Sequence, residues 1–201
     1  MARLTAATVE ELRETGFDGL TVRNVARRAG VAPATAYTYF ASKEHLVTEV
    51  YWQRVQALPQ PSIDRRRSPA GRVSAVLEGL GLLVADEPEL AAACTTALLA
   101  TDAEVRRVRD AIGLHTQGLL RAAVGDVASP AAIRTLEAAF SGLMVQAGVG
   151  AIAYRNIPDR MDEVAHVVFG DPTAPASTSA RHANTRSTAT RAATRAQEGP
   201  R

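Results

Sequence analysis

Few side chains in this chain of 201 residues stand at spacings that serve catalysis or metal binding. Glu163 and His166 have the Glu-x-x-His spacing of a metal site in a helical bundle, but such a site uses two copies and no second copy occurs. Cys94, the single cysteine, excludes an internal disulfide and serves either packing or redox sensing. His115 is either a core histidine or a polar contact for a ligand. With no nucleophile elbow or phosphate-binding glycine loop, we expect no enzyme, cofactor or metal.

The densest pattern, in residues 21–46, marks the boundaries of short helices. Thr21 is a suitable N-cap, Gly30 can end the helix that follows, and Pro33 suits the first position of the next helix. Ser42 caps a further helix. We expect three residues of the second short helix to point inward: Ala36, Tyr37 and Phe40. Two short helices joined by a glycine turn form a helix–turn–helix, which places its second helix in the major groove of DNA.

A helix before this segment completes a small unit. Leu4, Thr8 and Leu12 are four residues apart and share one helix face. Gly16 has the position of a residue that ends the helix. These signals predict a three-helix N-terminal domain.

Residues 4–46 resemble the DNA-binding domain of the tetracycline-repressor (TetR) family of bacterial transcription regulators. The matching residues are Gly16, Phe17, Thr21, Val22, Val25, Ala26, Ala29, Gly30, Val31, Thr35, Tyr37, Phe40, Ser42, Lys43, Glu44 and Leu46. The chain departs from the family at 32–34, where Ser, a basic or polar residue and Gly are usual, at Ala36, where Leu is usual, and at Tyr39, where His is frequent.

The resemblance implies DNA contacts from the second short helix and from the starts of its neighbours. We expect these contacts from Thr21, Arg23, Thr35, Tyr37, Thr38, Tyr39 and Lys43. Phosphate contacts by Lys43 and Tyr39 would fix the register on the duplex, while Thr35 could reach a base edge. Residues 1–58 carry seven Lys/Arg against six Asp/Glu, so affinity must come from a few well-placed donors that a dimer doubles.

The middle of the chain predicts further helices with marked starts at 68–69, 86–88, 101–104, 129–130 and 158. The segment 101–104 has a capping-box pattern. No alternating strand pattern competes. We therefore expect an all-α fold of about nine helices. The predicted parts are a helix–turn–helix domain (1–46), a linking helix (43–58) and a helical ligand-binding and dimerisation domain (47–170).

The resemblance implies that this second domain binds an effector and forms the dimer. Its inward positions are mostly apolar, which favours a hydrophobic or amphipathic small molecule that moves the helix 43–58. The candidate ligand contacts are Trp52, Val55, Leu77, Leu80, Cys94, Leu98, Ile112, His115, Leu119, Phe140 and Met144. A ligand acts only by favouring the state that does not bind DNA.

The predicted helix 130–154 is apolar on more than one side, and a face that its own domain leaves uncovered needs a partner. Small residues such as Gly142 would let a second helix approach closely. The resemblance also implies a dimer built from the last two helices. The candidate interface residues are Ser141, Val145, Gly148, Val149, Ile152, Val164 and Val168.

Residues 171–201 contain no aromatic residue and no apolar face, and they carry five Arg against two acidic residues. This composition predicts a disordered basic tail, with a weak DNA-binding arm as the alternative. The chain has neither a membrane span nor an apolar signal segment, so we expect a cytoplasmic protein.

Together these features predict a homodimeric repressor that a hydrophobic effector releases from a palindromic DNA operator. Two alternatives stay open. A ligand-independent or architectural DNA-binding regulator would have a closed, fully packed second domain. A helical enzyme with a vestigial DNA domain would hold a buried cluster of perturbed ionisable groups.

Overall fold

Helices make up all the regular structure in the described part of the chain. A computed structural model describes residues 2–59 and 64–170, so the predicted disordered tail lies outside the described residues. The helices are α1 (Ala2–Gly19), α2 (Val22–Arg28), α3 (Pro33–Tyr39), α4 (Lys43–Ala57), α5 (Pro69–Gly81), α6 (Pro88–Leu98), α7 (Ala103–Val124), α8 (Pro130–Gly148) and α9 (Ile157–Phe169), with 3₁₀ turns η1 (Gly125–Val127) and η2 (Tyr154–Asn156). The described residues thus confirm the all-α prediction of about nine helices.

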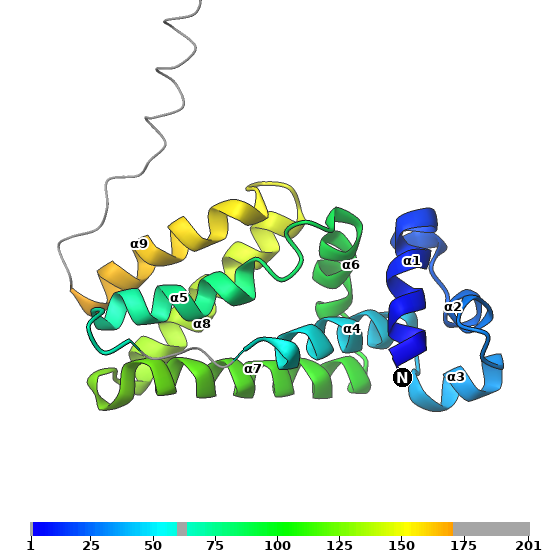
Figure 1. The fold of residues 1–201 in the computed structure, drawn as a ribbon, viewed down its shortest axis with the longest axis horizontal. Coiled ribbons are helices and arrows are strands. Elements are labelled where there is room, and N and C mark those ends of the chain that lie inside the picture. The colour runs from blue at the N-terminus through cyan, green and yellow to red at the C-terminus, as the bar shows by residue number, and fades with distance from the viewer. Residues whose placement is uncertain (1, 60–63, 171–201) are drawn as a thin grey trace, which may run out of the picture.

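The helices α1, α2 and α3 form a group at one end of the molecule, at the right of Figure 1. The helix α4 leads from this group into the remaining bundle, where it packs on α6 and α7. The helix α6 also packs on α1. The helices α5 and α9 lie against each other, and α8 packs on α9. Two helices, α4 and α6, therefore join the first group to the rest.

The helix starts follow the local sequence signals. The side chains of Thr21, Ser42, Ser68 and Ser129 each accept a hydrogen bond from the backbone N–H three residues ahead, at 3.0–3.2 Å. These contacts satisfy donors that a helix leaves unpaired in its first turn. At the capping-box pattern the prediction is one residue off, because Asp102 rather than Thr101 caps α7 and accepts from the N–H of Val105 at 3.0 Å.

One predicted helix end is confirmed and another is wrong. Gly16 has the expected positive φ of 66° and a non-helical ψ, so the first helical stretch of α1 ends there, and a second short stretch continues to Gly19 beyond this kink. The predicted helix 130–154 stops at Gly148, and Gly150 follows with a φ of 78°. This turn brings the Tyr154 hydroxyl within 3.1 Å of the Thr95 hydroxyl and of the Ala91 carbonyl oxygen. Tertiary hydrogen bonds to α6 thus accompany the early end of α8.

One apolar core runs through both parts of the molecule. Leu12, Val25, Phe40 and Leu46 fill its N-terminal portion, and each is at most 1% exposed. The remaining portion holds aliphatic side chains from α4 to α9. Burying one such side chain contributes about 1.5–3 kcal/mol. Packing therefore holds the first three helices together as one group, which matters for the surface that they present.

Candidate functional site

The turn between α2 and α3 depends on the backbone conformation of Gly30 and on hydrogen bonds from Arg3. Gly30 adopts a φ of 62°, which a residue with a Cβ rarely tolerates. Arg3, on α1, donates hydrogen bonds to the carbonyl oxygens of Ala29 at 2.7 Å and Gly30 at 3.0 Å. These contacts satisfy carbonyl groups at the end of α2 and connect the turn to α1.

The helix α3 has one buried face and one exposed face. Ala36 and Phe40 are buried, as expected, and α3 packs on α2. Tyr37 was expected inside as well as at the DNA contact, and its inward placement is wrong: its side chain is 52% exposed, as is that of Tyr39. A seven-residue helix turns Tyr37 away from the stripe that Ala36 and Phe40 define. Thr35 and Thr38 are also exposed, and the Thr38 hydroxyl donates to the Thr35 carbonyl oxygen at 2.6 Å.

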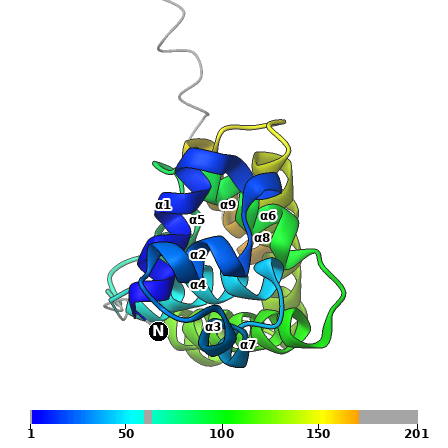
Figure 2. The same ribbon diagram turned by 90° about the vertical axis from the view of Figure 1, so that its right-hand side faces the viewer.

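The outward face of α3 therefore carries four hydrogen-bonding side chains and no covering element. Figure 2 views the molecule from the end that α1, α2 and α3 occupy. Hydroxyl groups on an exposed short helix after a glycine turn suit hydrogen bonds to phosphate oxygens and base edges.

Some of the basic side chains near this face already form ion pairs within the chain, whereas others can bind DNA. Arg28 is engaged, because it donates to Glu11 at 2.7 Å and to Glu14 at 2.8 Å. The hydrogen bond from Arg28 holds the pKa of Glu14 below its usual range. Arg23 and Arg27 are exposed and have no ion-pair partner among the described residues. Sequence reasoning chose Arg23 and missed Arg27, although the two lie four residues apart on one face of α2.

Lys43 has a structural contact that the sequence did not reveal. Its ammonium donates to the Phe17 carbonyl oxygen at 2.9 Å and lies 4.4 Å from the centre of the Phe17 ring. An ammonium has three protons, so two remain for a phosphate. The kink at Gly16 places Phe17 beside the start of α4. Thr21 is exposed, but its hydroxyl oxygen already caps α2.

The predicted ligand contacts meet in the interior of the second helical group. Six of them are buried in one cluster: Val55, Leu77, Leu80, Cys94, Leu119 and Phe140. Four more pack partly buried against it: Trp52, Leu98, Ile112 and Met144. The Trp52 and His115 rings meet edge to face, with centres 5.5 Å apart, and so join α4 to α7. The structure thus brings the predicted residues together around an apolar interior.

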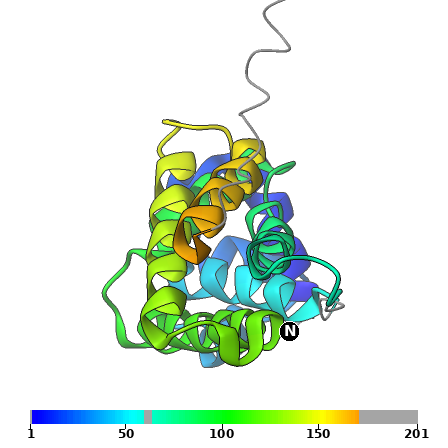
Figure 3. The same ribbon diagram turned by 90° about the vertical axis from the view of Figure 1, so that its left-hand side faces the viewer.

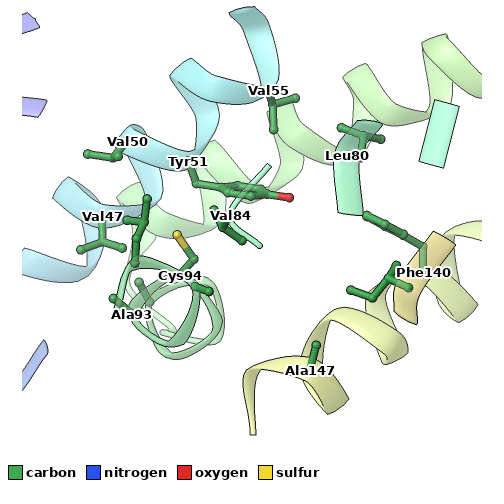
Figure 4. Packing of buried hydrophobic residues seen from close by; sticks show 14 of the residues in the cluster. Val47, Val50, Tyr51, Val55, Leu80, Val84, Ala93, Cys94, Phe140 and Ala147 are labelled. Atoms are coloured by element: carbon green, nitrogen blue, oxygen red, sulfur yellow. The ribbon is translucent and has the colours of Figure 1, made fainter. Parts of the chain in front are cut away.

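Sequence reasoning missed Tyr51 in this interior. Its side chain is 4% exposed and extends from α4 into this cluster (Figure 4). No described residue forms a hydrogen bond with the Tyr51 hydroxyl, and burial raises its pKa. Burial also raises the pKa of the neighbouring Cys94 thiol to about 12, which keeps the thiol protonated and argues against a redox role. The spacing of Tyr51, four residues from both Val47 and Val55, could have identified it.

A cleft of about 380 Å³ opens near the end of α8. Its walls come from the turn between α5 and α6, the first turns of α6, the end of α8 and the segment around Tyr154. Ala and Gly dominate the lining, and Arg155 and Asp86 supply one charge of each sign. A small molecule with an apolar body could enter here.

The predicted dimer residues divide between exposed and internal positions. Ser141, Val145 and Val149 are exposed on α8 and just after it, with Val149 70% exposed. Ile152, Val164 and Val168 instead pack partly buried against the core of their own chain. At Gly148, a Cβ would overlap the side chain of Thr95 on α6, so this small residue serves a contact within the chain. Val167, at 81% exposure, was missed because it lies outside the inward positions of α9.

The remaining candidates have internal roles. Glu163 pairs with Arg160 at 3.4 Å, and His166 lies 2.8 Å from the Asp162 carbonyl oxygen through Nδ1. Within the described residues, no group of three or more metal-binding side chains occurs. No described helix is long and apolar enough to cross a membrane.

Comparison with known proteins agrees with this geometry. The family model of bacterial regulatory proteins of the tetR family matches residues 4–50. An uncharacterized HTH-type transcriptional regulator of Mycobacterium tuberculosis is 45% identical over 175 residues, which cover 86% of this chain and 82% of the relative. The HTH-type transcriptional repressor KstR of Rhodococcus jostii is 28% identical over 125 residues, covering 62% of this chain and 59% of KstR.

A solved structure shares the fold. A TetR transcriptional regulator from Rhodococcus sp. RHA1 superposes with a TM-score of 0.69 at 20% identity, covering 86% of this chain and 95% of the other. The helix–turn–helix of α2 and α3, the family match over it and the mycobacterial relative lead to one conclusion: the chain belongs to the TetR family of bacterial regulatory proteins and is a DNA-binding transcriptional regulator.

Proposed function

We propose that the protein is a homodimeric repressor that leaves a palindromic operator when a hydrophobic small molecule binds to it. Residues 1–46 form the DNA-binding domain, the helix 43–58 links it to the second domain, and residues 47–170 bind the effector and the second subunit. The protein works in the cytoplasm, where the operator is accessible.

The exposed face of α3 carries this proposal. Four side chains that can hydrogen-bond stand on that face while Ala36 and Phe40 anchor the opposite face in the core. Thr35 reads a base edge, and Tyr39 and Lys43 bind phosphates. Tyr37 and Thr38 add contacts from α3, and Thr21 and Arg23 bind the backbone from the start of α2. Arg27 joins them, because it is exposed on the same face of α2 as Arg23.

The interior of the second domain supports an apolar effector. Ten of the eleven predicted contacts belong to one apolar cluster or pack on it, and the exception, His115, lies against Trp52. The helix α4 carries Trp52 and Val55 and also leads to the DNA-binding domain. A molecule that pushes α4 aside therefore changes the separation of the two α3 helices in a dimer. The similarity to KstR, which is named a repressor, favours repression over activation.

Footprinting on DNA from the region around the gene tests the proposal. We expect two protected half-sites related by a palindrome, with centres about 34–36 Å apart or a multiple of this distance. Sedimentation of the complex gives the number of subunits on each site. A single half-site protected by one subunit would contradict the dimeric repressor.

A further inference from the structure

Three helices meet at one carboxylate. Glu87 lies between α5 and α6, and each of its two oxygen atoms accepts from a different arginine. Arg13 on α1 donates through Nη2 to Glu87 Oε2 at 3.0 Å. Arg54 on α4 donates through Nη1 to Glu87 Oε1, and the same nitrogen lies 3.3 Å from the Leu83 carbonyl oxygen. Glu87 thus forms ion pairs both with α1, in the first helical group, and with the linking helix α4.

These charges are partly shielded from water. The side chains of Glu87 and Arg54 are 22% and 27% exposed, whereas that of Arg13 is 56% exposed. The hydrogen bond from Arg54, followed by the charges of both arginines, holds the pKa of Glu87 below its usual range. Glu87 stands at the N-cap of α6, yet its side chain caps no backbone N–H. Its carboxylate therefore serves the contact between helices rather than the start of α6.

The Arg13–Glu87 pair has a distinct place among the ion pairs of the described residues. The other pairs join α1 to α2, join α4 to its neighbours, or stay within one helix. Arg13–Glu87 alone among them connects α1 to the chain beyond α4. Asp86 and Pro88, on either side of Glu87, line the cleft beside α6. A movement of the turn that holds Glu87 would therefore be transmitted to α1 through the Arg13–Glu87 ion pair.

We propose that Glu87 is a positioning residue for DNA binding: through Arg13 and Arg54 it sets the orientation of α1–α3 relative to the second domain. This inference rests on the proposed operator binding. When α6 or its first turn moves, the two arginines follow the carboxylate, and α3 changes its angle to the rest of the subunit. Packing of α1 on α6 and α4 holds the first helical group against the second domain. Glu87 selects one orientation among those that this packing allows.

A distance measurement within one subunit tests the inference without an operator or an effector. Spin labels are attached to cysteines introduced at the exposed positions Ala6 on α1 and Ala122 on α7, in subunits diluted with unlabelled protein. Cys94 is buried, and its raised pKa limits its labelling. We expect a narrow distance distribution for the wild-type background and a distinctly broader one for Arg13→Ala and Glu87→Gln. Arg13→Lys, which keeps the cation, restores much of the narrow distribution.

Glu104→Gln is the matched control, because it removes a 3.0 Å ion pair with Arg107 that stays within α7. This variant should leave the distances unchanged. Thermal unfolding of each variant shows that the subunit remains folded, and Arg13→Ala keeps the test valid if Glu87→Gln does not fold. A distribution for Arg13→Ala as narrow as that of the wild type would overturn the positioning role.

Operator affinity gives the second measurement. Arg13→Ala and Glu87→Gln should each weaken binding to the footprinted duplex about two- to fivefold, the range expected for one partly exposed ion pair. Glu104→Gln should bind like the wild type. Unchanged affinity in both test variants contradicts the inference even if the distances broaden. If no operator is found, the proposed function fails, while the distance measurement still decides whether Glu87 orients the first three helices.

Discussion

Lys43 combines two interactions that are usually considered separately. Its ammonium donates to the Phe17 carbonyl oxygen and approaches the Phe17 ring, which ties the start of α4 to the segment after the Gly16 kink. The same ammonium has protons left for a DNA phosphate. A residue at this position can thus hold the domain together and bind the duplex backbone.

Replacing Lys43 with Ala should weaken binding to specific and scrambled duplexes by a similar factor, because a phosphate contact carries no sequence information. The slope of log affinity against log salt should fall by roughly 0.9 for each lost contact. Losing the Phe17 contact should also lower the free energy of unfolding by about 0.5–1.5 kcal/mol. Fluorescence anisotropy at several salt concentrations and chemical denaturation measure these quantities.

Thr35→Val provides the comparison for Lys43→Ala. It removes an exposed hydroxyl on α3 and should change the base preference without changing the salt slope. A changed base preference with an unchanged slope in Lys43→Ala would show that the phosphate assignment is incorrect.

Among the helices, the packing of α8 on α6 depends on the absence of a side chain at Gly148. Gly148→Ala should destabilise the protein by about 1–3 kcal/mol, because the new Cβ overlaps the Thr95 side chain and the structure must shift to accommodate it. Combining it with Thr95→Gly should recover part of the loss in a double-mutant cycle. Gly118→Ala in α7 is the control: its Cβ meets no atom within 4 Å, so it should stabilise by about 0.5–1 kcal/mol. Equal effects of the two alanines on the unfolding midpoint would refute this account.

Local signals and distant contacts account for what the sequence could and could not predict. The caps at Thr21, Ser42 and Ser129 involve residues three apart, and a pattern of that length is visible in the sequence. The end of α8 depends instead on Tyr154 reaching α6, 59 residues earlier in the sequence. Arg13 and Glu87 are 74 residues apart, and no pattern relates them. The start of α3 and the exposure of Thr35, Thr38 and Tyr39 were therefore predictable, whereas the outward position of Tyr37 and the partners of the neighbouring arginines were not.

At the scale of the whole molecule, α8 and α9 lie at the end opposite α3 (Figure 3). Val145 on α8 and Val149 just after it are exposed, and Val167 on α9 is 81% exposed. A subunit that leaves such residues in water gains by covering them with the same surface of a second subunit.

Val149→Asp should therefore give monomers that remain folded and lose operator affinity, because a buried charge without a partner is costly at an interface. Leu114→Asp on α7 is the control, since Leu114 is 69% exposed and lies outside the proposed interface. Analytical ultracentrifugation, circular dichroism and a binding assay give the three readouts. A Val149→Asp protein that is still dimeric and binds with full affinity would place the interface elsewhere.

The contact between Trp52 and His115 provides an intrinsic fluorescence probe. Trp52 is the single tryptophan of the chain, so its emission comes from one known place, on α4 and against α7. The ring is partly buried, and its spectrum therefore responds to a change in its exposure to water. Compounds that move α4 should alter the intensity or wavelength of this emission without any label. A library can thus be screened for the effector by fluorescence titration before the operator is known.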